Sequence, residues 1–340
     1  MIDLLIAGAG PVGLVTAIHA AQAGLDVAII DPRVGTIDKA CGEGLMPQAL
    51  EHLRGIQIDP PGIDFVGIRY IADGKSVDAK FTKNFGRGVR RTTLHDQLRN
   101  RASQLNIKII DGKVREIRQE IDYVEAAGIQ SRYLIGADGL HSTVRSQLNL
   151  YVPPKRNSAQ RYGLRQHFAI APWSNFVEVC WLPDAELYIT PVDNQTVGIA
   201  ILGTETMDFW GIIAQYPDLE ARLRSVEPAS KLRGAGPLRQ RTRARTIGRA
   251  LLVGDAAGYV DALTGEGMRM GFEEGKAAVD SVLANNPHKY ESDWRKITRS
   301  YRVLAGGLLW ASTNRLVRPM IVPAAKTLPL VFRRIVNTLG

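Results

Sequence analysis

The stretch Leu4-Leu5-Ile6-Ala7-Gly8-Ala9-Gly10-Pro11-Val12-Gly13 runs from a short apolar segment directly into a glycine-rich turn. A second apolar segment, residues 27–30, ends at Asp31. Such a turn lets the backbone approach a pyrophosphate at a helix N-terminus, and an acid about twenty residues later can hold a ribose hydroxyl. The pattern predicts a strand, a phosphate-binding loop and a helix. The residues expected to hold a dinucleotide here are Gly8, Gly10, Pro11, Gly13 and Asp31.

Residues 4–25 carry no charge, so a signal peptide or a membrane-spanning helix is the alternative interpretation of this segment. No basic residue precedes the run, and it contains Thr16, His19 and Gln22 besides three glycines at nucleotide-loop spacing. These features favour the strand–loop–helix interpretation over a membrane segment.

The composition is that of a globular chain, not a disordered one. With 340 residues, of which 45% are hydrophobic, it is long enough for one large domain or two ordinary ones. The two cysteines, Cys41 and Cys180, cannot form a disulfide framework and have no metal-ligand spacing. We therefore expect no metal and a reducing, cytoplasmic location.

The formal charge of +9 is concentrated at the C-terminus. After Asp293 the chain has no acidic residue and nine basic ones, which are Arg295, Lys296, Arg299, Arg302, Arg315, Arg318, Lys326, Arg333 and Arg334. Apolar residues are interleaved with them, as is typical of a segment that lies peripherally on a membrane surface. The alternative is a helical layer packed on the protein body with solvated bases, and the two can coexist. No nucleic-acid partner is expected, because no aromatic platform accompanies the charge.

The middle of the chain consists of short runs of alternating polarity. Those at 163–169, 176–181, 187–191 and 196–202 predict an antiparallel sheet. A fully apolar run at 250–253 then precedes helix-forming sequence at 267–283, so the nucleotide-binding part should be discontinuous. The expected domains are residues 1–150 with 235–290 for nucleotide binding, 151–234 for an antiparallel substrate sheet, and 291–340 for a basic, apolar helical segment.

Three further local predictions follow. Thr92 or Thr93 is expected to cap a helix beginning in the run Arg91–Leu98. Residues 107–110 and 114–117 are expected to be strands. Four arginines alternate later in the chain, namely Arg239, Arg241, Arg243 and Arg245. Their spacing predicts a strand with four guanidiniums on one face, and a solvated face is favoured over an anion site.

Two later segments indicate a flavin in particular. Gly136-Ala137-Asp138-Gly139 follows a strand-like run and supplies a second backbone crossing near a pyrophosphate. Gly254-Asp255-Ala256-Ala257-Gly258 places a carboxylate at a strand end, where it can accept from a ribityl hydroxyl. Gly265 and Gly267 begin a helix whose N–H groups can face the pyrimidine end of an isoalloxazine. NAD needs neither feature, so FAD is the expected cofactor.

These segments resemble an FAD-dependent group that joins class A aromatic hydroxylases, geranylgeranyl reductases and flavin-dependent halogenases. Residues 134–145 are similar to that group's Asp-Gly fingerprint, and residues 254–258 and 264–267 to its Gly-Asp fingerprint. The resemblance implies that Arg91 contacts FAD and that the loop 41–47, which includes Gly44, runs beside the flavin. It implies an α/β fold with an α+β insert: a Rossmann-like FAD-binding domain, an antiparallel-sheet substrate domain and a C-terminal helical segment.

Four other residues are weighed as flavin contacts. Arg33 can reach adenine or a phosphate, or it can lie exposed in a loop. Glu43 and Met46 can line the flavin edge or belong to a simple loop. Val114 completes the expected cofactor-binding set.

Departures from the group's motifs narrow the reaction. The halogenase Trp-x-Trp-x-Ile-Pro signature is absent, and residues 187–191 stand in its place. Residues 261–263 are closer to geranylgeranyl reductases, but the Trp-containing sheet motif of those enzymes is missing. The segment 162–173 resembles a bacterial branch of monooxygenases. The favoured expectation is an FAD-dependent monooxygenase that hydroxylates a hydrophobic, phenolic small molecule with NAD(P)H and O2. The alternatives are a geranylgeranyl-reductase-like enzyme that reduces a prenyl-chain alkene, and a non-catalytic FAD-binding protein.

The sequence does not assign a catalytic residue. Arg165 and His167 share one face of an expected strand, and together with Tyr188 they are the candidates. One of them could polarise or deprotonate a phenol, although a histidine satisfied within the sheet is the commoner outcome. Cys41 is expected to be an ordinary buried thiol, not a catalytic thiolate.

Overall fold

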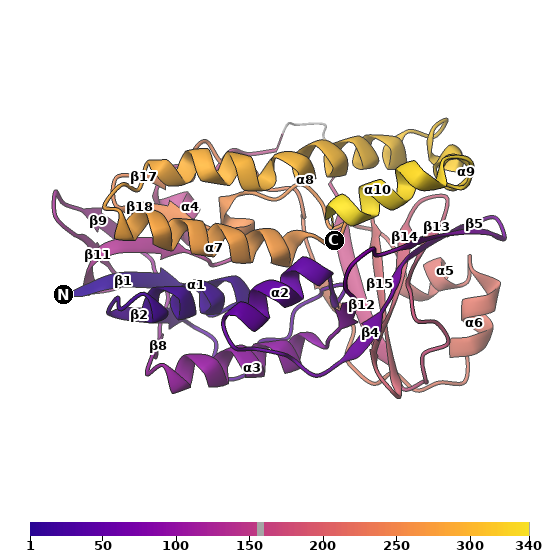
Figure 1. The fold of residues 1–340 in the computed structure, drawn as a ribbon, viewed down its shortest axis with the longest axis horizontal. Helices are drawn as coiled ribbons and strands as arrows, with labels where there is room; N and C mark the ends of the chain where they lie inside the picture. Colours follow the sequence, from indigo (N-terminus) through magenta and orange to yellow (C-terminus); the bar gives the residue numbers. More distant parts are fainter. Residues whose placement is uncertain (155–159, 340) are drawn as a thin grey trace.

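A computed structural model describes residues 1–154 and 160–339 of the chain. A mixed sheet with its helices forms one end of the molecule, and a second, antiparallel sheet forms the other (Figure 1). The C-terminal helices run along one side of both parts. This is the α/β architecture with an antiparallel substrate sheet and C-terminal helices that the sequence predicts.

The first sheet has a parallel core in the order β18-β11-β1-β2-β8. Its strands are β1 (Ile2–Ala7), β2 (Val27–Asp31), β8 (Lys108–Asp111), β11 (Ile129–Gly136) and β18 (Ala250–Leu252). β1 lies in the middle, pairing with β2 on one side and β11 on the other. Because both faces of such a sheet are covered, its central strands are continuous apolar runs. Three short strands extend the edges, namely β9 (Ile117–Gln119), β10 (Val124–Ala126) and β17 (Thr246–Ile247).

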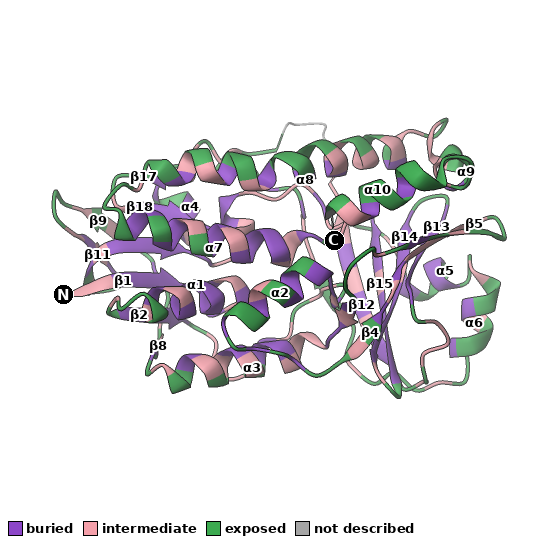
Figure 2. Cartoon of the chain, viewed as in Figure 1, coloured by how far each residue is buried: buried purple, intermediate pink, exposed green. Residues whose placement is uncertain are grey.

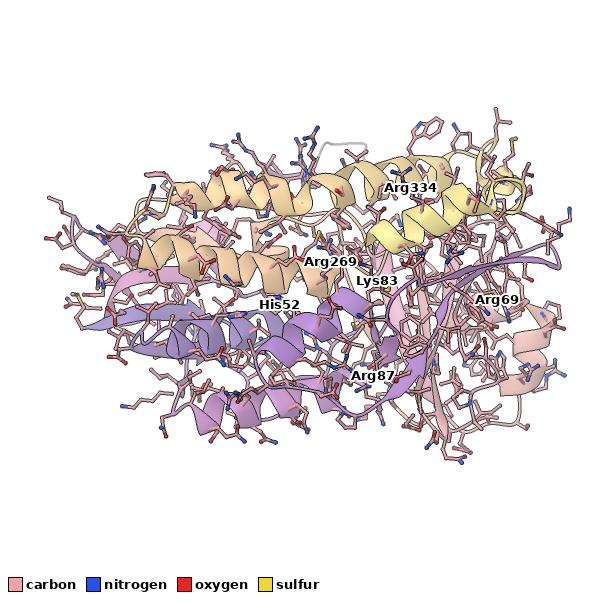
Figure 3. All side chains as sticks on the ribbon, viewed as in Figure 1. His52, Arg69, Lys83, Arg87, Arg269 and Arg334 are labelled. Carbon is pink, nitrogen blue, oxygen red and sulfur yellow. The ribbon has the colours of Figure 1, made fainter. Side chains whose placement is uncertain are left out.

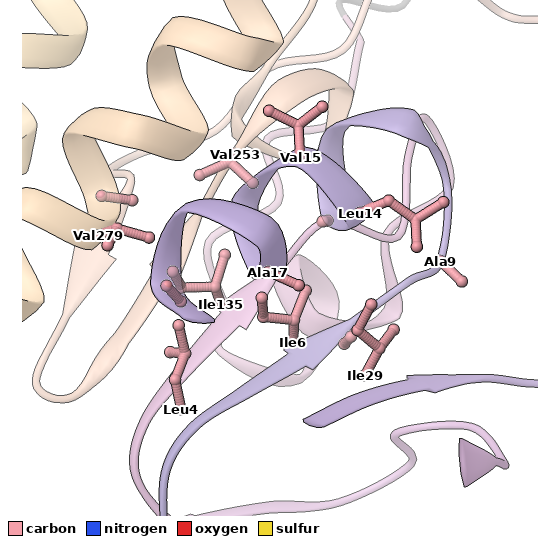
Figure 4. Packing of buried hydrophobic residues seen from close by; sticks show 14 of the residues in the cluster. Leu4, Ile6, Ala9, Leu14, Val15, Ala17, Ile29, Ile135, Val253 and Val279 are labelled. Carbon is pink, nitrogen blue, oxygen red and sulfur yellow. The ribbon is translucent and has the colours of Figure 1, made fainter. Parts of the chain in front are cut away.

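Helices cover the parallel core. They are α1 (Pro11–Gln22), α2 (Pro47–Gly55), α3 (Arg91–Gln104), α4 (Thr143–Gln147) and α7 (Gly267–Leu283), with the short 3₁₀ turn η1 (Gly254–Ala257). Figure 4 shows Leu14 and Ala17 of α1 among Ile6 of β1 and Ile135 of β11. All four side chains are fully buried. Their packing fixes the start of α1 at the carboxyl edge of β1, where the glycine-rich loop lies.

The second sheet has the order β16-β12-β15-β14-β13-β5-β6. The strands from the middle of the chain are β12 (Tyr162–Phe168), β13 (Val177–Trp181), β14 (Glu186–Asp193), β15 (Thr196–Gly203) and β16 (Arg233–Ala235). Two short helices, α5 (Phe209–Ile213) and α6 (Pro217–Leu223), cover its outer face (Figure 1). The antiparallel sheet predicted for this region is therefore present.

Part of this sheet comes from earlier in the chain than the sequence suggested. β5 (Gly67–Ala72) and β6 (Lys75–Lys80) form a hairpin, and β5 pairs in parallel with β13. The expected division had left these residues with the nucleotide-binding part. Next to the hairpin is a small sheet of β3 (Gly44–Leu45), β4 (Ile63–Phe65) and β7 (Gly86–Gly88). The excursion after β2 thus joins the two larger sheets.

Three local predictions differ from the structure. Residues 239–245 form no strand, because no neighbouring strand runs beside them. Gln240 and Thr242 make only isolated bridges. The Arg245 side chain turns inward and pairs with Glu291. α3 begins at Arg91 without a side-chain cap, so the expected threonine cap was wrong. The expected strand at 114–117 begins only at its last residue, and Val114 is buried in the preceding connection.

The C-terminal segment forms a layer on the protein body. It consists of α8 (Lys289–Thr313), η2 (Arg318–Met320), α9 (Ile321–Thr327) and α10 (Pro329–Leu339). Phe332 and Val336 of α10 pack on Ala79 of β6. The Arg318 guanidinium donates to Glu186 (2.6 Å) and to the carbonyls of Leu182 (2.7 Å) and Ala185 (2.6 Å). The outer sides of α8 and α10 are exposed, whereas both sheets are largely buried (Figure 2). Among the described residues no helix has the length and apolarity needed to span a bilayer.

Candidate functional site

A cavity of about 1070 Å³ lies where the glycine-rich loop, the second sheet and the C-terminal helices meet. Its lining changes character along its length. Near the parallel sheet it is formed by glycines and by charged residues, namely Gly10, Arg33, Lys39, Arg91, Asp138, Asp255, Gly265 and Gly267. Further away it is formed by apolar residues of β13–β15, α8 and α10.

The glycine-rich loop lies tightly against the turn after β11. Gly8 has a φ of +111°, and a Cβ there would lie 2.5 Å from the Ala137 carbonyl oxygen. A Cβ at Gly13 would lie 1.9 Å from the Gly8 carbonyl oxygen. At Gly10, by contrast, a Cβ would meet no atom within 4 Å, and this residue lines the cavity beside Pro11. The loop is thus closed on its packed side and open toward the cavity, as a backbone-bound pyrophosphate requires.

Asp31 lies beside this loop but does not line the cavity. Its Oδ2 accepts from the Ala9 N–H (2.7 Å), and its carboxylate also pairs with the Arg33 guanidinium. Burial raises the pKa of Asp31, but the hydrogen bonds from Arg33 and Ala9 outweigh burial and leave the pKa below its usual value. Arg33 lines the cavity, whereas Asp31 lies behind it.

Positive charge gathers in the cavity near Gly10. Lys39 and Arg91 line it with Arg33, and the buried Arg91 Nε has no hydrogen-bond partner. Burial lowers the pKa of Lys39, and the neighbouring Arg33 adds to this, as expected for cations held close together. Such a group of cations around an open glycine loop fits an anionic pyrophosphate. Lys39 carried no clear signal in the sequence.

Two carboxylates complete this half of the cavity. Asp138 Oδ2 accepts from the N–H groups of Thr143 (2.7 Å) and Val144 (3.1 Å), so Asp138 fixes the start of α4, while its Oδ1 has no partner. Burial raises the pKa of Asp255 against the opposing effect of Lys39 and Arg91. An acceptor in this position fits a ribityl hydroxyl. The glycines, cations and carboxylates present therefore fit FAD.

Buried side chains behind the cavity hold these loops in place. The Glu274 carboxylate accepts from the Gly254 N–H (2.6 Å), and burial raises its pKa to about 8. Arg145 donates to the carbonyls of Asp255 (3.2 Å) and Ala256 (3.1 Å). His95 Nδ1 accepts from the Ile37 N–H, so its Nε2 carries the proton and donates to the Ala9 carbonyl (2.8 Å). The sequence had no signal for His95 or Glu274, because neither belongs to a glycine-rich motif.

The loop before β3 carries a buried polar network. Glu43 has a φ of +60°, a strained value for a residue with a side chain, and its carboxylate accepts from the Arg91 N–H (2.8 Å). Its Oε2 lies 2.5 Å from His167 Nε2. His167 Nδ1 lies 2.8 Å from the hydroxyl of Ser230, which is half-buried. Arg165, beside His167, pairs with Asp38.

Of the three catalytic candidates, the cavity is lined by Tyr188 and not by Arg165 or His167. The Tyr188 hydroxyl donates to the Leu263 carbonyl (3.0 Å), and burial raises its pKa well above the usual value. Arg165 and His167 lie behind the wall, each only 1% exposed, and Glu43 lies between them and the cavity. Glu43 is thus the residue that lines the cavity and also contacts His167.

Of the other residues expected to contact the flavin, some line the cavity and some do not. Gly44, Met46, Gly265 and Gly267 line the cavity, whereas Val114 does not. Cys41 also lines it, and burial raises its pKa, which agrees with an ordinary thiol and not a thiolate. Within residues 1–154 and 160–339, no cluster of His, Cys, Asp and Glu side chains could hold a metal ion.

Comparisons with known proteins agree with this geometry. A family profile described as FAD binding domain matches residues 1–60 and 110–280. The menaquinone reductase of Mycolicibacterium smegmatis is 26% identical over 331 residues, covering 88% of this chain and 80% of that protein. The digeranylgeranylglycerophospholipid reductase of Methanococcus vannielii is 24% identical, covering 90% and 85%. Among solved structures, p-nitrophenol 4-monooxygenase PnpA from Pseudomonas putida is 16% identical with a TM-score of 0.75, covering 99% and 98%, a likeness of fold alone.

Proposed function

This chain belongs to the FAD binding domain family and is an FAD-dependent oxidoreductase, and we propose that it reduces a carbon–carbon double bond in an isoprenoid lipid. The favoured expectation from the sequence was hydroxylation of a phenol. The comparisons support the alternative better, because the reductases above match this chain over most of its length. Menaquinone and digeranylgeranylglycerophospholipid, which their names specify, both carry isoprenoid chains.

The observation that carries the proposal is the shape of the cavity. It continues from the glycine-rich loop along the second sheet to α10, and its far wall contains Val179, Leu202, Leu308, Phe332 and Val336. Burial of apolar surface drives ligand binding at roughly 25 cal/mol per Å². A cavity of about 1070 Å³ with an apolar wall of this extent suits a lipid chain better than a single small ring. A chain bound here would share the cavity with Glu43 and Gly44, which also line it.

FAD, when bound, would supply a hydride to one carbon of the double bond, with NAD(P)H as our proposed source of the electrons. Gly10 and the backbone of α1, Arg33, Lys39 and Arg91 would hold its pyrophosphate. Asp255 would accept from its sugar-alcohol chain. The protein then has to orient the lipid, exclude water and deliver a proton to the second carbon.

The Glu43–His167 pair is the proposed proton donor. Both side chains are 1% exposed, so the contact between them is shielded from bulk water. His167 connects in turn to Ser230, which is half-buried, and this connection gives a path from solvent: Ser230, His167, Glu43, cavity. The alkene carbon takes the proton from Glu43, and the path returns one to the pair. Positioned acids of this kind contribute roughly 10²–10⁴-fold to a rate.

Hydroxylation of an apolar phenol is the second candidate. The aromatic side chains of Tyr70 and Tyr188 in the cavity wall favour it, since they could stack on a ring. That reaction consumes O2, whereas reduction of an alkene does not. We further propose that the enzyme works in a reducing cytoplasm, where Cys41 and Cys180 stay free thiols.

The test compares products with and without oxygen. The purified protein with FAD and NAD(P)H is incubated with an isoprenoid lipid and, separately, with a long-chain phenol. The proposal predicts a product heavier by one pair of hydrogens from the lipid, formed equally well without oxygen. A product heavier by one oxygen atom, formed from the phenol in air alone, would replace it with hydroxylation.

A further inference from the structure

The cavity has an apolar opening between α8 and α10. Six residues of the C-terminal layer both line it and are exposed, namely Val303, Gly307, Ala324, Leu328, Val331 and Ile335; we call them the mouth. Exposed residues elsewhere along the lining include His141 and Glu205, which are polar. An exposed rim of apolar side chains at a cavity opening is unfavourable in water, so this opening is built to be covered.

Apolar exposure continues outward from the mouth along the C-terminal layer. Four more large apolar side chains of this layer are exposed, namely Trp310, Leu316, Met320 and Leu330. Leu330 is 78% exposed, the highest value among the large apolar side chains of α10. α10 buries Phe332 and Val336 on the second sheet, so Leu330 and Arg334, one turn apart, lie on its opposite side. Figure 3 labels Arg334 on α10 near α8. The layer thus has one face on the body and one apolar face outward.

The positive charge of the C-terminal layer indicates what kind of surface it binds. After Asp293 the chain has nine basic residues and no acidic one. One of them, Arg318, is paired with the buried Glu186. Arg315, Lys326, Arg333 and Arg334 are exposed. Exposed apolar side chains among unpaired bases are what an anionic lipid surface binds, because the headgroups attract the bases while the apolar groups enter the acyl boundary.

We infer that the outer face of α8–α10 docks on an anionic phospholipid bilayer, with the mouth opening against the lipid. Trp310 and Leu330 lie at the depth of the acyl boundary, and Arg333 and Arg334 lie among the headgroups. A lipid chain can then pass from the bilayer into the cavity without crossing water. This route for the substrate rests on the proposed function, whereas the docking itself does not.

The test is co-sedimentation of the full, FAD-loaded chain with vesicles of phosphatidylcholine, with and without phosphatidylglycerol. We expect binding to the vesicles that contain phosphatidylglycerol, weakened by added salt. The double variant R333E/R334E should bind at least about tenfold more weakly. Its matched control is R115E/R118E, which makes the same change of charge at exposed residues at the other end of the molecule, just before β9 and within it. The control should bind as the unaltered chain does.

Equal binding of R333E/R334E and the unaltered chain would overturn the inference, as would binding that does not depend on phosphatidylglycerol. A concentration-dependent dimer in the absence of vesicles that Leu330→Glu abolishes would instead assign the face to a second copy of the chain. Binding is read without any turnover, so the outcome is independent of the proposed reaction. Where turnover is found, R333E/R334E should lose it for lipid in vesicles and keep it for lipid dissolved in detergent.

Discussion

Glu43 Oε2 lies 2.5 Å from His167 Nε2, although the two residues are 124 positions apart in the chain. Glu43 belongs to the loop before β3, and His167 belongs to β12 of the second sheet. The contact therefore joins the loop before β3 to the second sheet. Because Glu43 also accepts from the first N–H of α3, the same carboxylate fixes the position of Arg91.

Glu43→Gln tests the role of this pair. Glutamine keeps the size of the side chain and can still accept from Arg91, but it cannot release a proton to a substrate. We expect turnover to fall by roughly 10²–10⁴-fold with FAD occupancy unchanged. Steady-state rates across pH and the flavin absorbance of the purified variant measure the two effects. Glu116→Gln, which makes the same change at a side chain that is 81% exposed, is the matched control and should keep the turnover of the unaltered protein. Full activity of Glu43→Gln would exclude Glu43 as the proton donor.

Asp255→Ala should weaken FAD binding. The change removes the acceptor proposed for a ribityl hydroxyl, and a hydrogen bond to a charged group contributes about 1.5–3 kcal/mol. The expected result is a dissociation constant for FAD raised by roughly 10- to 100-fold, measured by titration of the flavin-free protein. Asp122→Ala removes an equivalent charge at a side chain that is 89% exposed and should bind FAD normally. Undiminished affinity in Asp255→Ala would show that this turn does not hold the cofactor.

The pair His19 and His52 should make the fold sensitive to acid. Their Nε2 atoms lie 2.8 Å apart, and burial lowers the pKa of each ring from 6.5 to about 4. The unfolded chain therefore takes up protons first as the pH falls below 6.5, so the free energy of unfolding decreases between pH 6.5 and 4 and levels off below 4. Removing both rings in H19Q/H52Q should reduce this loss by roughly 3 kcal/mol for each ring.

Urea unfolding at several pH values measures this dependence. His288→Gln, which removes an exposed histidine, is the control and should keep the slope of the unaltered protein. A double variant with an unchanged dependence on pH would contradict the assignment to His19 and His52.

Arg318→Leu should loosen the C-terminal layer. Its guanidinium contacts Glu186, which is fully buried, and two carbonyls of the β13–β14 turn. Breaking a buried ion pair lowers the free energy of unfolding by roughly 3–5 kcal/mol. The loss should be smaller here, because Arg161 also pairs with Glu186. We expect faster cleavage by trypsin after Lys326 and Arg333. Arg315→Leu, at an exposed position, should leave the cleavage rate unaltered. Equal rates in the two variants would mean that Arg318 does not anchor the layer.

The parts of the fold that could be predicted are those encoded locally. Continuous apolar runs and glycine-rich turns gave β1, β2, β11, β18 and the loops around them, because the backbone there needs particular residues at particular places. The β5–β6 hairpin was missed, since its exposed polar face leaves little apolar pattern. The alternation at 239–245 was misleading, because alternation makes a strand only where a partner strand is available.

The candidate site shows the same limit. The motifs identified Gly10, Arg91, Asp138 and Asp255, which line the cavity. They could not show that His95 holds Ala9, because this contact depends on how segments 86 residues apart pack. They also did not show that Arg33 turns back to pair with Asp31, because a loop side chain two residues away can equally point to solvent. His167 was singled out from its strand alone, and its partner Glu43 became apparent with the fold.

The most direct test of the account mixes the protein carrying reduced FAD with an isoprenoid lipid in the strict absence of oxygen. The flavin absorbance reports its oxidation, and the lipid is analysed afterwards by mass. If electrons pass from the flavin to the double bond, the flavin reoxidises at a rate that rises with lipid concentration, and the lipid gains one pair of hydrogens. A flavin that stays reduced until oxygen is admitted would contradict the account.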